Sequence, residues 1–509
     1  MAMSDPMPVS MSANRSSIPL PMQRLALAGA LPLPVWLYLL AVAVPIGFNV
    51  GPLALSTLRL LLLVMIVPLL IGLFSGRFGK ILIIDVLFVL HILWVTLALA
   101  VNNPERVIEN TGAAAIEFLG GYVLGRAYIR TPEAFGALCK ALMLIVLFSA
   151  PFAVIETLTG HPLMLEAIRK LPGLTSYALN YQDPRFGLER VQFGFAHPIH
   201  YGLFASVAFS LVYVGLNGQI GHTRRVLSSA LIGACGFLAL SSGALLAIFL
   251  QLGLILWALV FNKVKARWWL LFGLFILAYI AIDLLSNRTP IKVFMTYATF
   301  SAHTAYWRSI IFDWGVANVI GSAEKGIVGS PLFGIGLKDW VRPWYMYSGS
   351  MDNFWLVIAV RYGIPGFLLL TLGYIIGVAR IMRRNFENDK ILTQFRLAWV
   401  FTFLGLSFTL STVHIWTSIY SFAFFIFGAG MWLITVQVKE RLSPDKSPDL
   451  QAVSTSQRPG LAFTRFPKSI KDGPHSRLGT PPRFSRRKTE DQILEKRHSE
   501  LQETKIKIK

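Results

Sequence analysis

A series of long apolar runs constrains this chain more than any other feature of its sequence. The stretch from Leu58 to Phe74 has Arg59 as its single charged residue, and Phe367 to Val378 has none. A helix needs about twenty such residues to cross the hydrocarbon core of a membrane, whereas a barrel strand alternates apolar and polar residues over roughly ten. With 54% hydrophobic and 14% charged residues, the chain is also too apolar for a soluble globular protein of 509 residues. We therefore predict an all-α polytopic membrane protein.

The same criterion predicts about twelve membrane-spanning helices. They lie near residues 34–52, 56–75, 80–101, 108–128, 134–157, 198–217, 226–241, 243–262, 268–286, 353–379, 391–411 and 414–437. Most Lys and Arg residues of the short connections fall on one side, and the alternate short connections hold only Arg106, so both termini are expected to be cytoplasmic. We predict a cytoplasmic segment at 1–33 without a signal peptide, a membrane domain at 34–437, and two long outer loops at 158–197 and 287–352.

The net charge of +21 would by itself suit a nucleic-acid partner. Residues 438–509, rich in Pro, Ser and charged side chains, supply +8 of that charge and lack the large apolar residues of a core. We expect a disordered cytoplasmic tail that contacts anionic lipid, and no nucleic acid. Cys139 and Cys235 lack the spacing of a disulfide framework or a zinc site, and no metal or cofactor is predicted.

The end of the first outer loop carries a group of candidate polar residues. Arg185 and Arg190 lie just before the sixth predicted span. The donor fork of Arg matches phosphate oxygens and its charge persists, so these residues suit a diphosphate at the membrane surface. The alternative is that they reach lipid phosphate or pair with a nearby carboxylate. His197 and His200 lack a third metal ligand, and we expect structural or hydrogen-bonding roles for them.

The second outer loop combines another arginine, Arg308, with many aromatic residues. These are Trp307, Trp314, Trp340, Trp344, Tyr345, Tyr347 and Trp355. Such rings stack on sugar faces and also line membrane interfaces, and both interpretations stay open. Gly334 and Gly336 fit neither a dinucleotide-binding nor a phosphate-binding loop, so we expect them to form turns.

Asp352 is the most informative acidic residue, because it stands where the tenth predicted span begins, next to Asn353. A carboxylate in the first turn of a helix is commonly a cap. A partly desolvated carboxylate can instead take the proton from a sugar hydroxyl as a general base. The sequence leaves open whether Asp352, Glu189 or His303 is nearest to an acceptor.

Taken in order, these segments resemble the O-antigen ligase and polysaccharide polymerase superfamily of bacterial inner-membrane glycosyltransferases. The resemblance covers roughly residues 185–366. The matching positions are Arg190, Gly194, His197 and Gly202 in the first segment, Arg308, Trp314 and Pro331–Gly336 in the second, and Asp352, Asn353, Gly363 and Gly366 in the third.

The resemblance implies a GT-C-like membrane glycosyltransferase architecture with a large periplasmic loop, in the bacterial inner membrane. It also implies a transfer of glycan from undecaprenyl pyrophosphate without a metal or cofactor. By this resemblance Arg190 and Arg308, assisted by Arg185, would bind the pyrophosphate, and Asp352 would face the acceptor hydroxyl. Further residues are expected to support the acceptor or the loops: Asn353, His197, His200, Trp314 and Arg342.

Ligases typically have a histidine where this chain has Asp352, which favours a polymerase that extends exopolysaccharide, capsule or O-antigen repeat units. The first alternative is an O-antigen ligase that transfers glycan to lipid A core or to a protein. The second is a transporter of polysaccharide or lipid-linked sugar, and a third is a silent partner of an export complex. The partners expected are a lipid-linked oligosaccharide, a glycan acceptor, membrane lipid, and chain-length or export proteins.

Overall fold

The computed structural model describes residues 31–50, 53–290, 293–294, 302–386 and 389–437. The chain forms two compact units, Met1–Glu440 and Arg441–Lys509, and the second lies outside the described residues. The predicted tail at 438–509 lies outside the described residues, and so do residues 1–30 of the predicted N-terminal segment.

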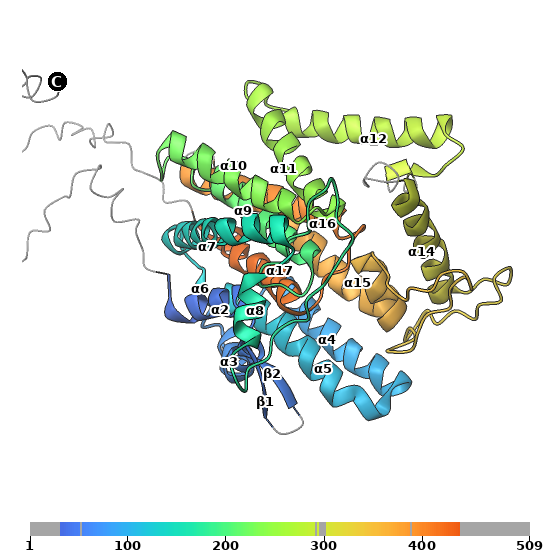
Figure 1. Ribbon diagram of the computed structural model, residues 1–509. Coiled ribbons are helices and arrows are strands. Elements are labelled where there is room, and N and C mark those ends of the chain that lie inside the picture. Colours follow the sequence, from blue (N-terminus) through green and yellow to red (C-terminus); the bar gives the residue numbers. More distant parts are fainter. Residues whose placement is uncertain (1–30, 51–52, 291–292, 295–301, 387–388, 438–509) are drawn as a thin grey trace, which may run out of the picture. The chain divides into compact units, whose positions relative to one another are not determined.

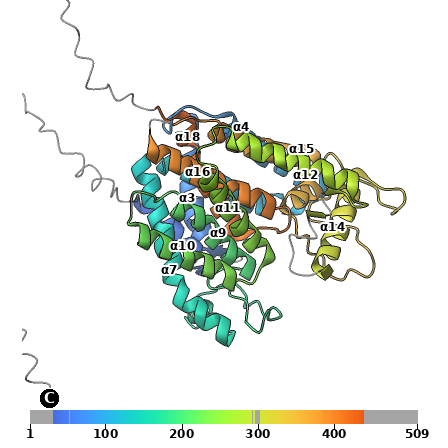
Figure 2. The same ribbon diagram turned by 90° about the horizontal axis from the view of Figure 1, so that it is seen from above.

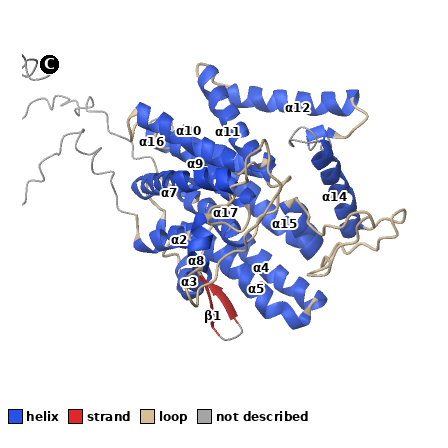
Figure 3. Ribbon diagram, viewed as in Figure 1, coloured by secondary structure: helices blue, strands red, loops and turns tan. Residues whose placement is uncertain are grey.

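In the described part, the regular secondary structure is helical apart from one two-stranded hairpin, and loops connect the elements (Figures 1 and 3). Eight helical stretches are long and apolar enough to cross a membrane. They are α3 Thr57–Phe74, α4 Ile83–Asn102, α7 Pro132–Thr159, α11 Ser242–Val260, α12 Arg267–Leu285, α15 Phe354–Met382, α16 Lys390–Thr409, and the pair α17 Thr417–Gly430 with α18 Trp432–Thr435. These helices indicate a multi-pass α-helical membrane protein, as the apolar runs predict.

The other four predicted spans hold shorter or interrupted helices. They are α2 Leu33–Ala43, α9 Pro198–Tyr213, α10 His222–Leu238, and the series α5 Val107–Ala115, η2 Ile116–Gly120 and α6 Gly121–Tyr128, in which η2 is a π-helical turn. The prediction of one span at 34–52 is wrong in its second half. There α2 ends at Ala43, and β1 Gly47–Val50 pairs with β2 Leu53–Ser56. Pro45 explains the early end, because the residue before a proline is excluded from helical geometry.

Helix α9 is the centre of one part of the bundle. It lies among α7, α10, α11 and α16 and contacts each of them (Figure 2). Nearly all of its residues are buried. The backbone of α9 can approach its neighbours closely at Gly202, which has no side chain. A Cβ on Gly202 would lie 2.6 Å from the Cβ of Ala244 and 2.8 Å from that of Ala239. This packing fixes the first turn of α9, where the first outer loop ends.

Two pairs of oppositely charged residues join neighbouring helices. The buried side chain of Arg126 lies 3.6 Å from Asp85, which also accepts a hydrogen bond from the hydroxyl of Tyr122. Arg59 donates to Glu117 at 2.8 Å. Buried charges are tolerated when they are paired in this way.

The second outer loop contains a helix that the sequence did not predict, α14 Ala302–Ile320. Its residues Ile311, Gly315 and Val319 recur every four positions and so share one face. A Cβ on Gly315 would lie 2.5 Å from Leu356, and Ile311 and Val319 are buried with the first turns of α15. A small second core therefore holds α14, which carries Arg308, against the start of α15.

The Pro331–Gly336 segment is joined to a break in α15. Pro365 has no N–H group, so the carbonyl of Arg361 lacks its helical partner. N–H groups of the segment donate instead to the carbonyls of Val360 at 2.8 Å and Arg361 at 3.0 Å. The two glycines of the segment have φ of +66° and +65°, which confirms them as turn formers.

Candidate functional site

The end of the first outer loop is fixed on the C-terminal turn of α7. Glu156 accepts backbone hydrogen bonds from Gln192 at 2.6 Å and Phe193 at 3.0 Å. The hydroxyl of Thr157 donates to the carbonyl of Glu189 at 2.7 Å, and the N–H of Glu189 donates back to Thr157 at 3.0 Å. The backbone around Arg190 is thus held from both sides.

Arg185 stands at one end of a tight turn. Its backbone exchanges two hydrogen bonds with Leu188, at 2.9 and 3.0 Å, and the intervening Phe186 and Gly187 both have positive φ, as in type I′ turns. The side chain of Arg185 donates to the carbonyl of Leu240 at 2.7 Å. The guanidinium therefore lies against the turn between α10 and α11.

Arg190 reaches the same turn. Its Nε donates to the carbonyl of Ala239 at 3.4 Å, and its Nη1 donates to Gln182 at 3.3 Å. Burial, with the nearby charge of Arg185, lowers the pKa of Arg190 to about 10, although Asp183 acts in the opposite direction. The group stays cationic at neutral pH. Within the described residues no carboxylate oxygen lies within 4.0 Å of a guanidinium nitrogen of Arg190. The predicted alternative, an ion pair with a nearby carboxylate, is therefore not observed for Arg190.

Arg308 is a buried cation whose donors are not all satisfied. Its side chain is only 7% exposed, and among the described residues neither Nε nor Nη1 has a hydrogen-bond partner. Burial lowers the pKa of Arg308 to about 10, while the charge of Asp352 raises it and that of Arg185 lowers it. Arg185 of the first outer loop and Asp352 of the second therefore both influence the charge of Arg308. Buried donors without partners are rare in folded proteins and indicate a position where a ligand completes the bonding.

Asp352 is not the cap of α15. The side chain of Asn353 has that role, because its Oδ1 accepts the N–H of Leu356 at 3.0 Å. Asp352 is half-buried and accepts only the hydroxyl of Ser350, at 3.0 Å, in the part of the chain described. The capping alternative is thus wrong for Asp352, and most of its capacity to accept hydrogen bonds is available for another group.

The two predicted histidines lie at the start of α9. His197 caps the helix, since its Nδ1 accepts the N–H of Ile199 at 3.1 Å. Burial, together with the charges of Arg190 and Arg185, lowers the pKa of His197 to about 4, so the ring is neutral at pH 7. The ring of His200 is fully buried and packs on Trp416 with centroids 4.1 Å apart.

Trp314 and Arg342 lie within the second outer loop and have contacts there. Lys325 stands 5.9 Å from the ring centre of Trp314. Arg342 pairs with Asp339 at 2.6 Å and donates to the carbonyl of Met346 at 2.9 Å. These contacts suit loop support, and the described contacts do not join either residue to Arg190. The side chain of His303 lies outside what the structure describes.

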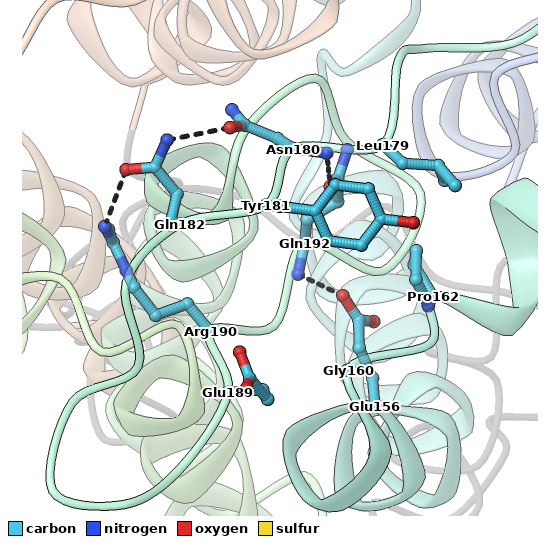
Figure 4. A pocket seen from close by; sticks show the side chains of 10 residues that line it. All are labelled: Glu156, Gly160, Pro162, Leu179, Asn180, Tyr181, Gln182, Glu189, Arg190 and Gln192. Carbon is cyan, nitrogen blue, oxygen red and sulfur yellow. Dashed lines mark hydrogen bonds between the residues drawn. The ribbon is translucent and has the colours of Figure 1, made fainter.

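A shallow pocket opens beside the Arg190 end of this group (Figure 4). It comprises about 310 Å³ of space, part of it open to solvent, and its polar lining consists of Glu156, Asn180, Tyr181, Gln182, Glu189, Arg190 and Gln192. Gln182 donates to Asn180 at 2.8 Å and accepts from Arg190, which forms a chain of hydrogen bonds along one side. Carboxylate and amide groups of this kind can bind hydroxyl groups. Glu189 is thus placed in this pocket, whereas the charge of Asp352 acts on Arg308.

Sequence reasoning missed several parts of the site. The carbonyls of Ala239 and Leu240 that receive the arginines are backbone groups, which no residue pattern marks. His414 and Trp416, on the turn between α16 and α17, pack against His200 and Phe354. The sequence signal for His414 is an ionisable residue at the edge of the predicted span 414–437. Among described residues, no group of three or more His, Cys, Asp or Glu side chains is placed to hold a metal ion.

Comparison of the chain with protein-family models gives no matching family, and comparison with curated proteins gives no match. Its function is therefore inferred from its own residues.

Proposed function

We propose that this protein is a membrane glycosyltransferase that polymerises lipid-linked polysaccharide repeat units. It takes glycan from undecaprenyl pyrophosphate and joins it to an acceptor sugar hydroxyl at the periplasmic face of the bacterial inner membrane. The observation that carries the proposal is Arg308: a buried, charged guanidinium with two unused donors, within electrostatic reach of Arg185 and Asp352. An anionic ligand that enters from the membrane surface would satisfy both donors.

The reaction follows from these positions. The acceptor oxygen attacks the anomeric carbon while the bond from that carbon to the phosphate oxygen breaks, and the acceptor proton passes to Asp352. Negative charge develops on the departing pyrophosphate, where Arg190 and Arg308 stabilise it. Removing one such preorganised group commonly lowers the rate by about 10² to 10³, and loss of a general base lowers it by roughly 10² to 10⁴. A single displacement inverts the anomer, and retention in the product would contradict it.

A row of aromatic rings supports binding of a sugar acceptor near Arg308. Ring centres lie 5.9 Å apart for Tyr306 and Trp307, 6.1 Å for Trp307 and Tyr345, and 5.7 Å for Trp344 and Tyr345. Trp344 is 86% exposed and Tyr306 57% exposed. Tyr306 and Trp307 directly precede Arg308, so these two rings and the arginine belong to the same turn of α14.

The proposal includes the finer membrane layout. The eight long apolar helices and the four shorter helical stretches would together make about twelve spans of a GT-C-like enzyme. Both termini would then be cytoplasmic, and both outer loops periplasmic. The lipid tail of the donor would enter laterally between helices.

The test is an assay of purified full-length protein with the undecaprenyl-pyrophosphate-linked repeat unit of its own host. The wild type should give a ladder of products, and Arg308→Ala and Asp352→Asn should each lose it. Arg169→Ala is the matched control, because Arg169 is an exposed arginine of an outer loop and should leave the ladder unchanged. A single transfer to lipid A core would indicate the ligase instead. Unchanged substrate with every acceptor would overturn glycosyl transfer and favour transport.

A further inference from the structure

The turn between α16 and α17, Ser411–Trp416, has a concentration of buried polar atoms without partners. Among the described residues these are Nδ1 of His414 and the hydroxyls of Thr409, Thr417 and Ser418, all within or next to this turn. Such atoms are few in a folded protein, and each requires an explanation. Their grouping in ten residues indicates that something other than the protein completes their hydrogen bonds.

The backbone of the same turn is held in an unfavourable conformation. Thr417, directly after Trp416, has φ of +52°, a left-handed value that a β-branched residue rarely adopts. Strained positions of this kind persist where the surrounding structure imposes them, and they are frequent at functional sites. The same turn is bound to α15, because the N–H of Phe354 lies 2.8 Å from the carbonyl of Leu410 and 3.0 Å from that of Val413.

Aromatic rings of the turn connect the two ends of the candidate site. His414 stacks near Phe354, two residues after Asp352, with centroids 6.1 Å apart and planes 21° apart. On its other side His414 lies 5.8 Å from Trp416, which in turn lies 6.0 Å from His197. His197 is the ring whose pKa responds to Arg190 and Arg185. His414 therefore lies between the Asp352 end and the arginine end.

His414 is suited to donate a hydrogen bond to an anion. Burial, with the charge of Arg361, lowers the pKa of His414 to about 3, so the ring is neutral at pH 7 and carries one N–H. A neutral donor binds phosphate without adding positive charge to a site that contains Arg190, Arg185 and Arg308. The titratable groups that face it are Arg361 from α15 and His200 from α9.

We propose that His414 binds the pyrophosphate of the lipid-linked donor, with its unpartnered Nδ1 donating a hydrogen bond to a phosphate oxygen. This inference rests on the proposed function for the identity of the ligand. It adds a neutral donor, on a segment that the sequence motifs do not include, to the arginines of the two outer loops.

The test measures binding of undecaprenyl pyrophosphate itself, without acceptor or turnover, to purified full-length protein by intrinsic tryptophan fluorescence. His414→Phe keeps an aromatic ring in the stack and removes the donor, and it should weaken binding about 10-fold, since a hydrogen bond to a charged group is worth roughly that factor. His414→Asn keeps an amide donor near the position of Nδ1 and should restore most of the affinity. His222→Phe, on a different connection of the chain, is the control and should bind as the wild type does.

The outcomes separate the two proposals. Wild-type affinity in a folded His414→Phe protein would overturn the role of His414 and leave the arginine site intact. Weakening by His414→Asn together with wild-type affinity in His414→Phe would show that only the packing of the ring matters, and would also overturn it. If the wild type itself does not bind the lipid pyrophosphate, both this inference and the proposed donor are wrong.

Discussion

Replacing Arg308 by methionine should lower activity and raise stability at the same time. Methionine keeps an unbranched side chain of similar length but removes the charge and the donors. In the structure Nε and Nη1 of Arg308 are buried without partners, and an unsatisfied buried donor costs about 1–3 kcal/mol. The two donors together therefore cost the substrate-free protein about 2–6 kcal/mol.

The pKa of Arg308 gives a second measure of the same cost. Its fall from 12.5 to about 10, caused mainly by burial, corresponds to about 3 kcal/mol against the charged form. The two values agree in size. A protein without this buried charge should thus unfold at a higher temperature, while its turnover should fall by about 10² to 10³ because a preorganised donor is lost.

The assay pairs thermal unfolding in detergent, followed by tryptophan fluorescence, with initial rates of polymer formation. Arg308→Lys serves as the comparison, since it keeps the charge but loses the planar donor fork. We expect it to remain unstable and to be only weakly active. Arg308→Met with a lower unfolding temperature would refute the reasoning, because Arg308 would then be a structural residue. Higher stability with full activity would remove Arg308 from the site.

Three further predictions concern other parts of the site. The pKa of His197 in the folded protein is about 4, below its ordinary value of 6.5, so the unfolded chain binds more protons between these two pH values. The free energy of unfolding should therefore fall as the pH drops from 6.5 to 4. His197→Asn, which can still cap α9, should flatten that slope when unfolding is measured as a function of pH. In steady-state kinetics, Glu189→Gln should raise KM for the donor and leave kcat nearly unchanged, whereas Asp352→Asn should lower kcat by roughly 10² to 10⁴. A large loss of kcat in Glu189→Gln, with only a change of KM in Asp352→Asn, would assign the general base to Glu189. Gly363→Ala should destabilise the protein by at least about 1 kcal/mol in thermal unfolding. Gly363 has φ of +72°, and a Cβ at this position would lie 2.1 Å from the carbonyl oxygen of Leu332. An unchanged unfolding temperature would show that the break in α15 is not required.

The sequence predicted the membrane helices well where apolar residues form an uninterrupted run. It failed at 34–52, where composition is apolar throughout but Pro45 ends the helix and the chain continues as a hairpin. It also missed α14, because only one face of that helix is apolar and its partner, the first turn of α15, is distant in sequence.

The sequence predicted which cations belong to the candidate site, but it did not predict how they are arranged in space. Arg185, Arg190 and Arg308 stand out as charges in outer loops, but only the fold shows that their charges influence one another. The cap of α15 is Asn353 and not Asp352, a difference of one residue that propensity cannot resolve. His414 could not be found from sequence, because its significance depends on a strained turn and on rings contributed by other helices.

The most direct test of the central claim is an experimental structure of the full-length protein with its undecaprenyl-pyrophosphate-linked repeat unit, using Asp352→Asn to hold the substrate. We predict density for the pyrophosphate within hydrogen-bonding distance of Nε and Nη1 of Arg308 and of the guanidinium of Arg190. The anomeric carbon should lie on the side of residue 352. A pyrophosphate bound elsewhere, with both donors of Arg308 still unpartnered, would contradict the account.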